Sequence, residues 1–177
     1  MAKPNKPKGR IAARLETQTD LSSNAVPELA QSLNGLVADS YVLYLKTKNF
    51  HWHVSGPHFR DYHLLFDEQA DQLFAATDVL AERVRRIGAE TVHSFAQMLK
   101  LTSLKENEAK YVSPLDMLKE LMADTKTVIR NMREVHELCD KHGDVATASI
   151  LETFIDDAEK RNWFLFETSR NAEAGGH

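Results

Sequence analysis

The stretch NFHWHVSGP, residues 49–57, separates two long helical patterns in this chain of 177 residues. Between residues 24 and 54, leucine, valine and tyrosine recur at steps of three and four, which is the period of an amphipathic helix. Residues 55–57 interrupt that pattern, because glycine and proline are poor helix formers. A second helical pattern follows and runs to about Ile87, where Gly88 ends it. The stretch therefore predicts a helical hairpin.

Two more helical patterns lie in the second half of the chain. The sequence SPLD, residues 113–116, is typical of a helix start, since it combines a serine cap, a proline at the first position and an acid in the first turn. This third helix runs to about Cys139, and Asp144 caps a fourth helix that continues to about Phe166.

Residues 89–112 connect the two halves and have a weaker pattern, with one short helix predicted at 94–99. A bundle uses such a long connection to cross from one end to the other. Strand patterns and internal repeats are absent from the sequence. The predicted fold class is therefore all-α, a four-helix bundle with a short extra helix in the long crossover connection. Trp163 stands in a helical pattern and is predicted to pack in the core.

Composition and charge narrow the class of protein. Hydrophobic residues make up 42% of the chain, and no apolar run is long enough to span a bilayer. The first residues lack the apolar block of a secretory signal, and Cys139 is the single cysteine, so no internal disulfide is possible. We expect one soluble cytoplasmic domain without a membrane partner.

The start of the chain differs in charge from the rest. The first 15 residues contain five basic side chains and no acid, whereas the remaining residues hold 17 basic and 26 acidic side chains, a net −9. We predict a disordered basic tail over 1–20, a folded bundle over 21–170 and a flexible end over 171–177. The basic side chains of the tail are Lys3, Lys6, Lys8, Arg10 and Arg14.

Five residue types that bind metals lie in or beside the second predicted helix. His63 and Asp67 are four residues apart and share one helix face, and so do Asp78 and Glu82. Eleven residues separate Asp67 from Asp78, so both pairs lie on one stripe, roughly 16 Å apart. The break at residues 55–57 folds the chain back and brings His51 across from His63. A single His–Asp pair at this spacing is more often a surface ion pair, but five ligand types in phase favour a metal site.

One metal centre cannot reach across three helical turns within one chain. The two clusters meet if a second copy of the helix crosses antiparallel about a two-fold axis near Gln72 and Leu73. Mixed imidazole and carboxylate ligands suit iron better than calcium, and carboxylates favour the ferric over the ferrous ion. The predicted metal ligands are His51, His63, Asp67, Asp78 and Glu82.

These motifs resemble those of the Dps family, the mini-ferritins named as DNA-binding proteins from starved cells. The resemblance rests on the segments NFHWHVSG at 49–56, HLLFDE at 63–68 and DVLAER at 78–83, and the pattern extends over most of the chain. It implies a ferritin-like bundle, a dodecameric shell, an iron-oxidising centre at each two-fold interface and hydrogen peroxide as the usual oxidant. It also implies a role for Trp52 as an electron donor beside the centre.

The expected function is therefore that of a ferroxidase that stores Fe³⁺ in a hollow shell and protects DNA from oxidative damage. Asp140, Asp144 and Glu152 are candidates for an iron entry pore at a three-fold axis, although acids at helix ends are usually solvated or capping. Two rival functions stay open. One is a nucleoid-compacting protein that binds DNA through the cations of the tail, and the other is a bundle that binds metal without oxidising it.

Overall fold

The computed structural model describes Leu15 and residues 17–170. The five basic side chains of the predicted tail, and the predicted flexible end at 171–177, lie outside the described residues. Within them there are helices and connections and no strand, so the predicted all-α class is confirmed.

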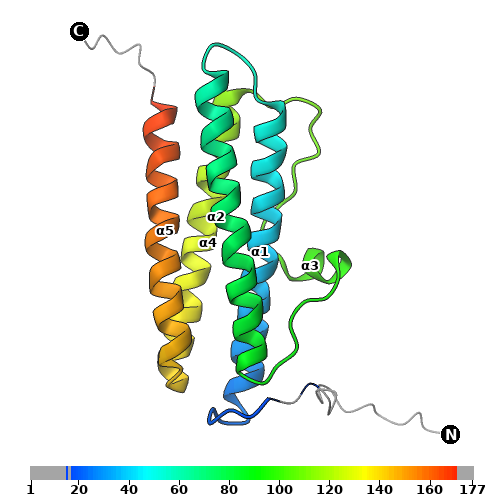
Figure 1. Ribbon diagram of the computed structural model, residues 1–177, viewed down its shortest axis with the longest axis vertical. Coiled ribbons are helices and arrows are strands. Elements are labelled where there is room, and N and C mark those ends of the chain that lie inside the picture. The colour runs from blue at the N-terminus through cyan, green and yellow to red at the C-terminus, as the bar shows by residue number, and fades with distance from the viewer. Residues whose placement is uncertain (1–14, 16, 171–177) are drawn as a thin grey trace, which may run out of the picture.

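Among the described residues, four long helices run side by side along the molecule, and one short helix lies beside them (Figure 1). The long helices pack mainly in two pairs, α1 with α2 and α4 with α5, and α1 also packs against α4. The short helix α3 contacts α1 and lies in the crossover connection, as predicted. The bounds are α1 Ala25–His53, α2 Phe59–Arg86, α3 Phe95–Leu101, α4 Pro114–His142 and α5 Val145–Ser169.

The core lies between the four long helices and is built from the apolar positions that set the helical period. Leu29, Phe50, Phe66, Leu118 and Leu151 are each at most 1% exposed. Removal of one such side chain from water contributes about 1.5–3 kcal/mol, so this core supplies most of the free energy that holds the helices together.

The predicted helix starts are confirmed by their caps. The Ser113 hydroxyl accepts a hydrogen bond from the backbone N–H of Asp116 at 3.3 Å, and an Asp144 carboxylate oxygen accepts one from the N–H of Thr147 at 3.1 Å. Gly143 adopts a φ of 72° and ends α4, because a residue without a side chain takes this left-handed conformation at little cost.

The crossover connection is tied to α1 by buried polar side chains. Asn34 accepts a hydrogen bond from the backbone N–H of Val92 at 3.1 Å and donates one to the carbonyl of Glu90 at 2.9 Å. Asp39, which is 2% exposed, accepts hydrogen bonds from the Thr102 hydroxyl and the backbone N–H of Ser103. These contacts fix where α3 lies against α1.

The prediction for Trp163 was wrong, because its side chain is 59% exposed. Ala158 and Leu165 mark the core face of α5, and Trp163 stands two positions before Leu165, which points it to the opposite side of the helix. None of the described helices is both long and apolar enough to cross a membrane.

Candidate metal centre

The two histidines predicted as ligands lie against each other at the turn between α1 and α2. Their rings are stacked, with centroids 3.8 Å apart, although twelve residues separate them in the chain. The Nδ1 of His51 is 2.8 Å from the carbonyl oxygen of His63, and the Nδ1 of His63 is 2.9 Å from the carbonyl oxygen of His51. The ring of Phe59 also stacks on His63, with centroids 5.0 Å apart.

This reciprocal pairing decides which ring nitrogens are available. A carbonyl oxygen only accepts, so in the neutral imidazole each Nδ1 carries the donated proton and each Nε2 has the lone pair. His51 lies in the last turn of α1, where a carbonyl has no partner within the helix, and His63 supplies that partner. Both imidazoles are thus held in the tautomer and orientation that a metal ligand needs.

Asp67 lies one turn after His63 on α2, and its Oδ1 is 3.7 Å from the Nε2 of His51. The same oxygen accepts a hydrogen bond from the Nζ of Lys48 at 2.5 Å. This hydrogen bond raises the pKa of the Lys48 ammonium and lowers the pKa of the Asp67 carboxyl. The sequence analysis missed Lys48, although its position one turn before His51 places it on the same side of α1.

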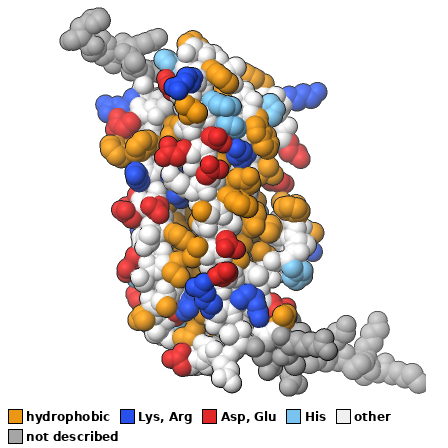
Figure 2. Space-filling view, viewed as in Figure 1, with side chains coloured by type: hydrophobic (Ala, Val, Ile, Leu, Met, Phe, Trp, Pro, Cys, Tyr) orange, Lys and Arg blue, Asp and Glu red, His pale blue; other side chains and the backbone are white. Residues whose placement is uncertain are grey.

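The second ligand pair lies further along α2, and both of its side chains are exposed. Glu82 forms an ion pair with Arg86, one turn further along the same helix. Asp78 and Glu82 therefore stand on an outer surface of the bundle. Figure 2 shows the acidic side chains over α2 in an upper and a lower group on this face.

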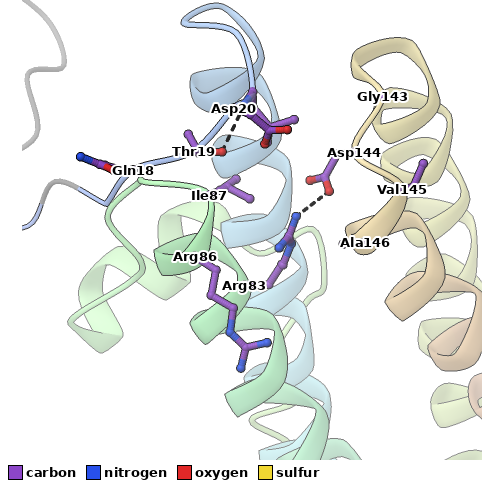
Figure 3. A pocket seen from close by; sticks show the side chains of 11 residues that line it. Gln18, Thr19, Asp20, Arg83, Arg86, Ile87, Gly143, Asp144, Val145 and Ala146 are labelled. Carbon is purple, nitrogen blue, oxygen red and sulfur yellow. Dashed lines mark hydrogen bonds and ion pairs between the residues drawn. The ribbon is translucent and has the colours of Figure 1, made fainter.

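A buried ion pair holds the end of α2 beyond Glu82. Arg83 donates to the Asp144 carboxylate at 2.5 Å and to the Thr147 hydroxyl at 2.7 Å, and the Asp144 side chain is only 2% exposed. Figure 3 shows Arg83 directed towards Asp144 and Arg86 directed away from it. Arg83 thus fixes the turn between α4 and α5 to α2, and leaves Glu82 facing outwards.

The segment before α1 also lies against this end of α2. Arg85 donates a hydrogen bond to the carbonyl of Leu15 at 2.6 Å. Gly88 has a φ of 89°, and a Cβ at this position would stand 2.9 Å from the carbonyl oxygen of Thr17. Leu15 and Thr17 lie within the segment predicted as the tail. A pocket of about 650 Å³ opens here between residues 18–21, the end of α2 and the start of α5 (Figure 3).

The two ligand clusters do not meet within one chain. Over residues 15 and 17–170, no group of three or more His, Cys, Asp or Glu side chains is arranged to hold a metal ion. At the first cluster the Asp67 carboxylate accepts a hydrogen bond from Lys48, and the second cluster has two carboxylates and no imidazole. Neither cluster is therefore a complete metal site within the described part of one chain.

An apolar groove of about 800 Å³ lies beside the first cluster, between α1, α2 and α3. Several of its large side chains are strongly exposed, among them Phe95 at 77%, Leu45 at 53% and Phe74 at 53%. In Figure 2 hydrophobic side chains gather beside α2 on the side of α1 and α3. Contiguous exposed apolar surface of this kind marks a site of interaction with another protein, a membrane or a ligand. The groove is lined by apolar side chains that include Tyr41, Tyr44, Leu45, Trp52, Phe74, Phe95, Met98 and Leu99.

Trp52 and the predicted pore residues have different surroundings. Trp52 follows His51 in the chain, is 57% exposed and lines the apolar groove. Asp140 and Glu152 are exposed and lie on opposite edges of the His136 ring, at 3.5 and 3.1 Å. Asp144 is instead committed to Arg83 and to the cap of α5, which leaves no free carboxylate oxygen facing solvent.

A four-helix bundle with one long crossover connection is the architecture of ferritin-like proteins. Residues 30–173 match the family model described as a ferritin-like domain. The DNA protection during starvation protein of Brevibacillus brevis is 34% identical over 137 residues, which cover 77% of this chain and 91% of that protein.

Solved structures agree with this assignment. The X-ray structure of Dps from Thermosynechococcus elongatus is 30% identical, with a TM-score of 0.82, over 85% of this chain and 96% of that one. Dps from Vibrio cholerae O1, described as a ferritin-like diiron-carboxylate protein, is 28% identical, with a TM-score of 0.83, over 90% of this chain and 100% of that one. The chain belongs to the Dps family of ferritin-like proteins.

Proposed function

We propose that this chain is the subunit of an iron store, which oxidises Fe²⁺ at centres shared between two subunits and deposits Fe³⁺ inside a hollow shell. The family membership supports iron as the substrate, since one of its relatives is described as a diiron-carboxylate protein. Removal of free Fe²⁺ would protect DNA from oxidative damage, which agrees with the name of the Brevibacillus relative.

The observation that carries this proposal is the common centre of the two ligand pairs on α2. Asp67 and Asp78 are equally far along the helix from residues 72 and 73, and His63 and Glu82 share that midpoint. A second α2 that crosses antiparallel at this point brings Asp67 opposite Asp78 and His63 opposite Glu82. The apolar groove beside the first cluster supplies surface for such a contact.

In such a centre the chain's own groups have separate roles. The Nε2 lone pairs of His51 and His63 bind Fe²⁺, while the carboxylates attract Fe³⁺ more strongly than Fe²⁺ and so favour oxidation. Hydrogen peroxide takes electrons in pairs and leaves as water, so no hydroxyl radical is released. Trp52 follows His51 in the chain and lines the groove. It would donate one electron when iron has supplied only one of the two that peroxide takes.

A mixed assembly tests whether the centre is shared. Asp67→Asn breaks the first half of the centre and Glu82→Gln breaks the second. We expect each variant alone to lose rapid peroxide-driven oxidation of Fe²⁺. When the two variants are co-expressed, half of the dimers contain one chain of each kind, and one of their two centres is intact. Random pairing therefore restores about one quarter of the wild-type rate.

The rate is measured by stopped-flow absorbance after Fe²⁺ and peroxide are mixed. Co-purified chains that carry different affinity tags confirm that the variants have assembled together. If the mixture stays as inactive as the single variants, the centre is not shared between subunits. If the wild-type protein binds Fe²⁺ but the absorbance does not rise when peroxide is added, the protein is a metal buffer and not a ferroxidase.

A second function, DNA binding, is favoured by the charge of the first 15 residues. Five cations on every chain of a shell would contact DNA phosphates with high avidity and without sequence preference. A gel-shift titration with and without residues 1–14, at two salt concentrations, tests this role. DNA binding that persists without the tail would exclude this role.

For iron entry, the exposed Asp140 and Glu152 stay candidates to line a pore.

A further inference from the structure

Both halves of the proposed centre carry a basic side chain on one of their carboxylates. In the first half, the Nζ of Lys48 is 2.5 Å from the Oδ1 of Asp67. In the second half, Arg86 pairs with the Oε2 of Glu82. The two cations come from different helices, and Figure 3 shows that Arg86 is directed away from Asp144, the carboxylate at its end of the bundle.

The Lys48 contact occupies the oxygen that a metal ion would use. The Oδ1 of Asp67 faces the Nε2 of His51 at 3.7 Å. Two ligand atoms about 2.1 Å from one ion stand roughly 3.0–3.5 Å apart at angles between 90° and 110°, so this pair is close to the separation that a shared metal ion requires. An ammonium group at 2.5 Å from the same oxygen would lie beside that ion and repel it.

The cations also change the charge of the interface before any metal arrives. Without them, the three carboxylates of one centre would give it a charge of −3 when both subunits meet. Lys48 and Arg86 reduce that charge to −1. Carboxylates that lose water at an interface without a partner oppose association, so the neutralisation favours contact between metal-free subunits.

We propose that Lys48 and Arg86 are internal counter-ions, which hold Asp67 and Glu82 in the metal-free protein and are displaced when a divalent cation binds. This inference rests on the shared centre of the proposed function. The inference makes two opposite demands on each basic side chain. Removal of the side chain should strengthen metal binding, and the same removal should weaken the association of metal-free subunits. A side chain that only supports the fold would weaken both.

Binding of Co²⁺ to the full-length protein tests the first demand without any redox step. We expect Lys48→Gln to raise the Co²⁺ affinity roughly tenfold, because a charge-assisted hydrogen bond no longer competes for Asp67. Arg86→Gln should raise it about two- to threefold, since the exposed pair with Glu82 is weaker. Lys48→Arg keeps the cation and should bind Co²⁺ like the wild type. Lys119→Gln, which breaks an exposed pair with Asp116, is the matched control and should not change the affinity.

The mass of the metal-free assembly at low ionic strength tests the second demand. The variant with both Lys48→Gln and Arg86→Gln should release more free subunits than the wild type, and Co²⁺ should restore the assembly. If Lys48→Gln leaves the Co²⁺ affinity unchanged or lowers it, while Asp67→Asn abolishes binding, the counter-ion role is wrong and the centre stands. If Asp67→Asn binds Co²⁺ like the wild type, the proposed centre itself is wrong.

Discussion

The two ends of α2 are built for different purposes. At its start, His51 and His63 hold each other through backbone carbonyls, and Asp67 lies beside them partly exposed. At its end, Arg83 forms a buried ion pair with Asp144, and the carbonyl oxygen of Thr17 lies so close to Gly88 that a Cβ there would stand 2.9 Å from it. The first end fixes the tautomers of two imidazoles, and the second fixes the positions of helices.

This difference bears on the proposed shared centre, in which each end of α2 would supply one half. The histidine end is organised by the turn between α1 and α2, so its ligands are already oriented. The carboxylate end needs no such organisation, because Asp78 and Glu82 stand on a rigid helix whose direction the Arg83–Asp144 pair secures. We expect substitutions at the two ends to separate stability from metal binding.

The largest effect is expected for Arg83→Ala. This change leaves the Asp144 carboxylate buried without a cation, and should lower the free energy of unfolding by about 3–5 kcal/mol. Urea unfolding followed by far-UV circular dichroism measures the change. Arg133→Ala breaks an exposed pair with Glu159 and should cost less than about 1 kcal/mol. Equal losses of unfolding free energy in the two variants would contradict a stabilising role for the buried Arg83–Asp144 pair at the end of α2.

At the other end, His63→Ala should weaken Co²⁺ binding by about 100-fold or more. It removes one ligand and the ring that stacks on His51, whereas the backbone carbonyl that accepts from the Nδ1 of His51 stays in place. Loss of an outer-shell partner alone costs 10–100-fold in metal affinity, and loss of a ligand should cost at least as much. Isothermal titration calorimetry measures the affinity. His53→Ala is the control, since the ring of His53 bonds to the Asn49 carbonyl of its own helix, outside the centre. If both variants lose affinity equally, the stacked pair has no special part in binding.

A smaller loss of stability is expected for Gly88→Ala. A side chain at a φ of 89° costs about 1–2 kcal/mol, and its Cβ would push against the carbonyl of Thr17. Gly35→Ala gives a control of opposite sign. Gly35 lies in α1, where a Cβ meets no atom closer than 3.9 Å, so alanine should stabilise the helix by about 0.5–1 kcal/mol. Thermal unfolding that moved in the same direction for both would contradict the close approach at Gly88.

The smallest effect is expected for Glu28→Gln, at the same end of the bundle as Arg83. Hydrogen bonds from His142 and Lys141 lower the pKa of the Glu28 carboxyl below its ordinary value of 4.5. A carboxyl whose pKa is lowered in the folded state stabilises the protein at pH values above its ordinary pKa. This contribution is lost as the pH falls through the folded pKa. Glu28→Gln should therefore lower the Tm slightly at pH 7, and the difference should vanish in acid. A difference that grew on acidification would reverse this sign.

Much of the fold was predictable because local signals agree with one another. The caps at Ser113 and Asp144, the break at 55–57 and the helical period all point to the same helices, and the structure confirms them. The stacking of His51 on His63 also follows from a hairpin that turns midway between them. Trp163 was misplaced, because a helical position alone does not say which face of the helix meets the core.

The sequence alone determined where residue types that bind metals stand along α2 and how far apart they are, since the rise of a helix is fixed by its backbone geometry. The tertiary structure decided which cations reach those ligands. Lys48 meets Asp67 across 19 residues, and Arg83 meets Asp144 across 61, because packing of apolar faces brings the helices together and spacing along one helix cannot report it.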